Sequence, residues 1–139
     1  YGCQCLRPYA VFDDPEMPTS MEPLIRAVGA EVFPWAMGGR CCGASHMNTQ
    51  PEVGITLVAG ILKAARGADV IVTVCPMCQM NLDMRQSDIL KETGRRYNMP
   101  VLYITQLMGI CLGLSKSDLG LGRLINSPKE VMVKVANNG

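Results

Sequence analysis

Aromatic side chains are scarce in this sequence, which has two Phe, one Trp and four Tyr among its 139 residues. The core must therefore be largely aliphatic, with ten Met available to fill irregular gaps. Hydrophobic residues make up 48% of the chain, which is enough for one domain with a core of its own. We expect Met77, Met80, Met84 and Met99 to belong to that core.

An excess of charge of one sign is also missing. The 13 Lys and Arg residues nearly balance the 12 Asp and Glu residues, and the net charge is +1. A nucleic-acid-binding surface needs a basic stripe, so no nucleic-acid partner is predicted. A membrane span needs about 18 consecutive apolar residues, and glycines interrupt the longest candidate, Leu107 to Leu114. No membrane span is predicted either.

The seven cysteines are an odd number. A disulfide framework is typical of small secreted scaffolds, but those seldom carry clear helix and strand patterns. The cysteine spacings favour metal or redox chemistry in a reducing cytoplasm. The chain starts at Tyr1 rather than at a Met, and we expect it to be the second half of a longer protein.

Strand and helix patterns alternate along the chain. The β-branched run Val70–Val74 and the apolar run Val101–Ile104 predict buried parallel strands. A strand is also expected at Ala30–Pro34, and Tyr1–Cys3 is expected to end another. Helices are predicted after capping boxes at Thr19–Glu22 and Thr49–Glu52, from Pro76 to about Asn98 with a restart near Ser87, and over Gln106–Leu114; the tail from Pro128 is expected to be extended.

These elements predict an α/β fold in one domain, residues 1–139. We expect a parallel sheet of about four strands with helices on both faces. Cys3, the pair Cys41-Cys42 and the pair Cys75/Cys78 each follow a predicted strand. Because ligands of such sheets bind at the carboxyl ends of the strands, the three groups are predicted to share one site there.

Thiolates are soft ligands that suit zinc and iron–sulfur clusters. Cys75 is predicted to cap a helix whose first turn contains Cys78, where free N–H groups and the helix dipole favour thiolate. Side chains of adjacent residues usually diverge, so the pair Cys41-Cys42 suits a cluster of several irons better than one tetrahedral zinc. Gly43 would let the backbone approach that cluster. A structural zinc site that uses four of the five cysteines remains an alternative.

The spacing of these cysteines, with Tyr1-Gly2-Cys3, Cys75-Pro-Met-Cys-Gln-Met-Asn-Leu-Asp83 and Val101-Leu-Tyr-Ile-Thr-Gln-Leu107, resembles the C-terminal Cys-Cys-Gly domain of the heterodisulfide reductase B subunit. The resemblance implies a cysteine-rich domain of an oxidoreductase, paired with an N-terminal Cys-Cys-Gly domain of the same polypeptide. It also implies two partners, the iron–sulfur C subunit and the flavin-containing A subunit of such a complex. The substrate would be a disulfide of the coenzyme M–coenzyme B type.

The same resemblance implies a non-cubane 4Fe-4S cluster bound by Cys3, Cys41, Cys42, Cys75 and Cys78, with Gly43 beside it. Cys41 and Cys42 would be the catalytic positions. The chain alone would be inactive and could be isolated empty. Related domains occur in quinone-linked dehydrogenases, so an electron-transfer or assembly module is an alternative function.

Four other residues have open roles. Cys5 could replace Cys3 as a ligand or be a free thiol in a loop. His46 could face the cluster or substrate at a catalytic position, or be an ordinary loop histidine. Arg7 could pair with an anionic substrate or fix its own loop, and Cys111 is expected to be a small buried apolar residue.

Overall fold

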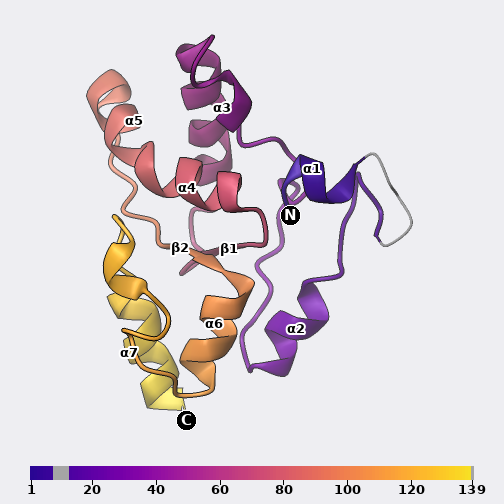
Figure 1. Cartoon of the computed structure of the whole chain (residues 1–139), viewed down its shortest axis with the longest axis vertical. Helices are drawn as coiled ribbons and strands as arrows, with labels where there is room; N and C mark the ends of the chain where they lie inside the picture. The colour runs from indigo at the N-terminus through magenta and orange to yellow at the C-terminus, as the bar shows by residue number, and fades with distance from the viewer. Residues whose placement is uncertain (8–12, 139) are drawn as a thin grey trace.

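The computed structural model describes residues 1–7 and 13–138. Two parallel strands, β1 (Ile71–Thr73) and β2 (Val101–Tyr103), pair in the register Ile71↔Val101. Figure 1 shows helices on both sides of this small sheet. On one side are α3 (Pro51–Ala64), α4 (Pro76–Met84) and α5 (Gln86–Thr93); on the other are α6 (Ile104–Cys111), α7 (Lys129–Asn138) and α2 (Glu22–Ala27).

The sheet separates two apolar cores, because successive strand residues point to opposite faces. Ile71 and Val101 pack with residues of α3, α4 and α5, among them Val58, Leu62 and Ile89. Leu102 faces the other way and packs with buried residues of α6 and α7, together with half-buried residues of α2. The prediction of an α/β fold with helices on both faces is therefore confirmed.

Proline fixes the start of the two helices that flank the cysteine residues. Pro51 occupies the first turn of α3, and Pro76 occupies that of α4, where its missing N–H costs nothing. Cys75 is the N-cap of α4, as predicted. The capping-box prediction at Thr49 is wrong, since the N-cap of α3 is Gln50 and no side chain caps that helix end.

The prediction of about four strands is wrong for the described part of the chain, which has a sheet of two. Cys3 opens a short helix, α1 (Cys3–Leu6), because Gly2, with a φ of 87°, turns the backbone before it. Residues 30–34 are not assigned as a strand. A strand needs a hydrogen-bonded neighbour, and these residues face a groove instead of one.

Two further expectations are also wrong. The tail after Pro128 is not extended but forms α7, which buries Val131 against the second core. Met77, Met80 and Met84 lie exposed on α4 rather than in the core, and only Met99 packs against it. None of the described helices combines the length and the apolar character needed to cross a membrane.

Candidate metal centre

Three chain segments bring their cysteines to the carboxyl end of β1. Cys75 lies two residues beyond that strand, and Cys78 is in the first turn of α4. Gly2 packs directly against both: a Cβ on Gly2 would lie 2.4 Å from Cys75 Cβ and 3.5 Å from Cys78 Sγ. Cys3 follows at the start of α1, which Figure 1 shows near the first turn of α4.

The adjacent pair Cys41-Cys42 reaches this rim from a loop rather than from a strand. Cys41 and Cys42 precede the 3-10 helix η1 (Ala44–His46), and Cys41 Sγ accepts a hydrogen bond of 3.3 Å from Gly43 N–H. Asn81 of α4 donates from Nδ2 to Cys42 O over 2.8 Å. The loop is thereby tied to the helix that carries Cys78.

The thiols perturb one another strongly. The hydrogen bond from Cys78 is the main cause that lowers the pKa of Cys42 to about 6, although burial opposes it. The same bond is the main cause that raises the pKa of Cys78. Burial raises the pKa of Cys3, and the neighbouring Cys41 thiol adds to that effect. Cys3 therefore lies within hydrogen-bonding reach of Cys41, and Cys42 within that of Cys78; we call Cys3, Cys41, Cys42, Cys75 and Cys78 the cysteine cluster.

The cluster is partly shielded from solvent. Cys42, Cys75 and Cys78 are buried, whereas Cys3 and Cys41 are half-buried at its outer side. Desolvation, and after it the neighbouring Cys75 thiol, raises the pKa of Cys5, which is exposed but also close to the site. Within residues 1–7 and 13–138, no three Cys, His, Asp or Glu side chains converge on a position suited to a single metal ion.

The close packing of the cysteine loop against α3 requires a glycine at position 43. Its φ is 76°, in the left-handed region, and a Cβ there would lie 2.9 Å from Gly54 Cα of α3. Gly54 is equally confined, since its own Cβ would meet Met47 Sδ at 2.4 Å. The two glycines therefore let the cysteine loop lie directly on α3. The sequence pattern pointed to a cofactor at Gly43 and gave no sign of this contact.

The sequence analysis assigns no role to Asn81. It is only 2% exposed, and its amide group holds Cys42 O as described above. A signal was available, because Asn81 is three residues after Cys78 in a predicted helix and therefore shares its face.

We expect Asn81→Leu to lower the free energy of unfolding by about 1–3 kcal/mol, since it leaves the buried Cys42 carbonyl without its donor. The loosened loop should also expose the Cys42 thiol to alkylating reagents. Urea unfolding and mass-spectrometric labelling of the metal-free chain measure the two effects. Gln79→Met is the matched control, because it removes another buried amide of α4, which donates to Val101 O over 3.3 Å. Equal labelling of Cys42 in both variants would contradict the role of Asn81.

His46 ends η1, three residues after Gly43. Its backbone is engaged, because His46 O accepts hydrogen bonds from Thr49 N–H and Gln50 N–H. The half-buried imidazole has no hydrogen-bond partner among the described residues. Its catalytic role stays a prediction.

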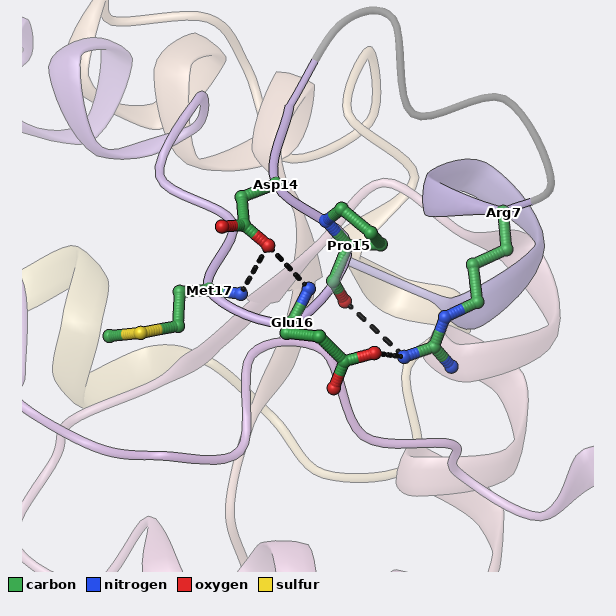
Figure 2. Close-up of polar contacts among 5 residues, drawn as sticks. All are labelled: Arg7, Asp14, Pro15, Glu16 and Met17. Carbon is green, nitrogen blue, oxygen red and sulfur yellow. Dashed lines mark hydrogen bonds and ion pairs between the residues drawn. The ribbon is translucent and has the colours of Figure 1, made fainter.

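Arg7 pairs within its own loop. Its guanidinium contacts the Glu16 carboxylate and donates to Pro15 O over 3.5 Å, as Figure 2 shows. Asp14 Oδ1 accepts from the N–H groups of Glu16 and Met17 and shapes the same turn. Of the two roles considered for Arg7, the structure shows the fixing of its own loop. Cys111 is half-buried in α6 and packs against the second core, away from the other cysteines.

A family model described as a cysteine-rich domain, CCG, matches residues 1–83, which include all five cysteines of the cluster. The chain belongs to this family of CCG cysteine-rich domains. The predicted relationship to the heterodisulfide reductase B subunit is confirmed by relatives of that name.

One such relative is the B subunit of the ferredoxin/F420H2-dependent CoB-CoM heterodisulfide reductase of Methanosarcina acetivorans, 30% identical over 143 residues that cover 97% of this chain and 47% of the relative. Another similar protein is the 8-methylmenaquinol:fumarate reductase membrane anchor subunit of Wolinella succinogenes. It is 36% identical over 125 residues, covering 87% of this chain and 44% of the relative. The third is an uncharacterized iron-sulfur protein of Methanococcus maripaludis, 29% identical over 76% of this chain and 21% of the relative. The chain thus spans less than half of the length of these relatives.

Proposed function

We propose that this chain is the cluster-binding domain of a B subunit of the heterodisulfide reductase type. The main support for this proposal is that three separate segments bring their cysteines to the carboxyl end of β1. These are Cys3, Cys41, Cys42, Cys75 and Cys78. All of them are free thiols, as are Cys5 and Cys111, which fits a reducing cytoplasm. The names of the relatives support a redox protein that contains iron and sulfur.

The donor set suits the group. Thiolates are the ligands that iron–sulfur clusters take, and five cysteines are one more than a cubane 4Fe-4S cluster uses, which is the reason the proposal keeps the non-cubane type. When bound, the cluster would supply one-electron transfer and iron with affinity for sulfur. Cys41 and Cys42 are the catalytic positions of the proposal, and Cys41 is one of the two ligands nearest to solvent.

The protein part of the site has two tasks in this proposal. Asn81 and Gly43 hold the Cys41-Cys42 loop in place, and the buried Cys75 and Cys78 shield the inner side from water. Reduction of a disulfide consumes two electrons and two protons and yields two thiols. The electrons would come from the iron–sulfur C subunit and the flavin-containing A subunit of the complex. The N-terminal Cys-Cys-Gly domain of the same polypeptide would complete the site, which agrees with the half-length coverage of the relatives.

Anaerobic reconstitution with iron and sulfide tests the proposal. We expect about four irons and four sulfides per chain and a paramagnetic signal on oxidation, as for a 4Fe-4S centre. Cys42→Ser should abolish this binding, whereas Cys111→Ser, on the far side of the sheet, should leave it unchanged. Absence of iron from the reconstituted wild-type chain would refute the proposal, and zinc that survives Cys42→Ser would favour the structural zinc site.

The fumarate reductase relative supports a second candidate, an electron-transfer or assembly module of a quinone-linked enzyme, because it is 36% identical to this chain. Both candidates predict the same cluster. They differ in turnover by the full-length complex: reduction of coenzyme M–coenzyme B disulfide supports the first, and its absence together with quinol-linked electron transfer supports the second.

A further inference from the structure

Cys5 lies next to the cysteine cluster but is not one of its five members. It belongs to the first turn of α1, where its backbone N–H donates to Gly2 O over 3.0 Å. Gly2 is the residue that packs against Cys75, and a Cβ on Gly2 would lie 3.1 Å from Cys75 Sγ. The Cys75 sulfur is therefore on the side of its residue that faces the start of α1, which Figure 1 shows near the first turn of α4.

The Cys5 and Cys75 side chains contact each other directly. Burial, then the charge of Cys75, then the hydrogen bond between the two thiols raise the pKa of Cys5. A disulfide needs Cβ atoms about 3.5–4.5 Å apart, and thiols that share a hydrogen bond reach this distance with a small movement. Cys75 is only 6% exposed, whereas Cys5 is exposed. Cys5 thus joins a buried thiol of the cysteine cluster to solvent.

Cys3 does not compete for Cys5, although the two are close in sequence. Side chains two residues apart on a helix do not face each other, and Cys3 and Cys5 are two residues apart on α1. Cys3 has a partner of its own, because it lies within hydrogen-bonding reach of Cys41. Of these three cysteines, only Cys5 is exposed.

Cys78 is the other thiol that contacts Cys75. It is buried, so a molecule in solution does not reach it before it reaches Cys5. Cys78 also contacts Cys42, and this contact changes the pKa of Cys78 more than the contact with Cys75 does. An oxidant from solution therefore meets Cys5 first, and Cys75 is the neighbour that can respond.

We propose that Cys5 and Cys75 form a reversible dithiol–disulfide pair in the chain without a cluster, and that a small soluble disulfide is the oxidant. The reaction is a thiol–disulfide exchange in two steps. The Cys5 sulfur attacks the small disulfide RSSR, which gives a mixed disulfide at Cys5 and releases one RSH. The Cys75 sulfur then attacks the Cys5 sulfur and releases the second RSH. The two protein thiols lose two electrons and two protons, and the small disulfide gains them.

The pair controls access to one position of the cysteine cluster. A disulfide at Cys75 takes away one thiolate, so the oxidised chain cannot load the cluster; this consequence rests on the proposed function. Iron bound at Cys75 would in turn prevent the disulfide. Because a disulfide is reversible and a sulfonic acid is not, the pair also keeps Cys75 recoverable when the chain is empty.

Oxidised glutathione tests the pair on the metal-free chain of 139 residues. Remaining thiols are alkylated, and linked peptides are identified by mass spectrometry without reduction. We expect a Cys5–Cys75 link and the release of two molecules of glutathione per chain. Cys75→Ser should stop after the first step and keep glutathione on Cys5, whereas Cys5→Ser should leave Cys75 reduced. Cys111→Ser is the matched control and should form the same link as wild type, because Cys111 packs against the second core.

A main link between Cys75 and Cys78, or between Cys3 and Cys41, would overturn the proposal. So would a stable glutathione adduct on Cys5 in wild type, or equal loss of the Cys75 thiol in Cys5→Ser. The Cys5→Ser arm changes an exposed residue, so the test does not depend on whether Cys75→Ser folds.

Iron uptake separates this pair from the proposed function. The oxidised wild-type chain should take up no iron until a dithiol reduces it, whereas Cys5→Ser after the same treatment should take up iron as the untreated chain does. If the reduced wild-type chain binds no iron, the proposed function fails while the disulfide link stands. If iron binds and the link is absent, only the pair is refuted.

Discussion

Replacing Gly43 with alanine is expected to lower the free energy of unfolding by about 2–5 kcal/mol. A non-glycine residue in the left-handed region costs about 1–2 kcal/mol, and forcing an extra methyl group into a packed contact costs about 1–3 kcal/mol. Both conditions apply at Gly43, where φ is 76° and the new Cβ would lie 2.9 Å from Gly54 Cα. The contact is with backbone, which cannot rotate away as a flexible side chain can. Denaturant unfolding of the metal-free chain measures the loss.

Gly113→Ala separates the two causes. Gly113 has nearly the same φ, 78°, but a Cβ there would have no neighbour within 4 Å. It should therefore lose only the conformational part, about 1–2 kcal/mol. If Gly43→Ala and Gly113→Ala destabilise the chain equally, the close contact between the cysteine loop and α3 contributes nothing. A larger loss at Gly43 supports the contact as the feature that seats the Cys-Cys-Gly loop.

The elements best predicted from sequence are those whose causes are local. A β-branched run, a proline in the first helical turn and an apolar repeat placed β1, α4 and α3 correctly, including Cys75 as the N-cap of α4. The prediction of an extended tail after Pro128 is wrong, because the helix found there depends on Val131 and Val135 packing against the second core. That packing is a tertiary effect and leaves only a short signal in the sequence.

The strands predicted at Ala30–Pro34 and at Tyr1–Cys3 are not observed among the described residues, for a related reason. Residues 30–34 have strand-like composition, but a strand exists only where a neighbour bonds to it, and within residues 1–7 and 13–138 the N–H groups of Glu31, Val32 and Phe33 donate no backbone hydrogen bond. The prediction of one shared cysteine site was argued from strands of which only the one before Cys75 is observed, and as a metal site it stays a prediction. What could not be anticipated were close backbone approaches such as Gly43 to Gly54 and Gly2 to Cys75, because a glycine in a sequence does not reveal what it touches.

Gly2→Ala is expected to have the largest effect on the proposed cluster. The added Cβ would lie 2.4 Å from Cys75 Cβ and 3.1 Å from Cys75 Sγ, and the φ of 87° strains any side chain. Tyr1 is bonded to Gly38 and Met21, so the strain cannot be relieved without moving Cys3 or Cys75. We expect iron affinity to fall by about 10–100-fold, the range for changes that disturb the support of metal ligands. Chelator competition on the reconstituted chain measures it.

The matched control for this change is Gly120→Ala, at the start of η2 (Leu121–Arg123), where φ is also positive at 61° and no atom lies within 4 Å of the new Cβ. It should keep its iron affinity, so a loss limited to Gly2→Ala traces to the contact with Cys75. Alkylation of the metal-free chain provides a readout that does not require the cluster. The buried Cys75 thiol should react faster in Gly2→Ala than in wild type, because the displaced residue no longer covers it. Unchanged Cys75 reactivity would show that Gly2 does not shield this ligand, whether or not the chain binds iron.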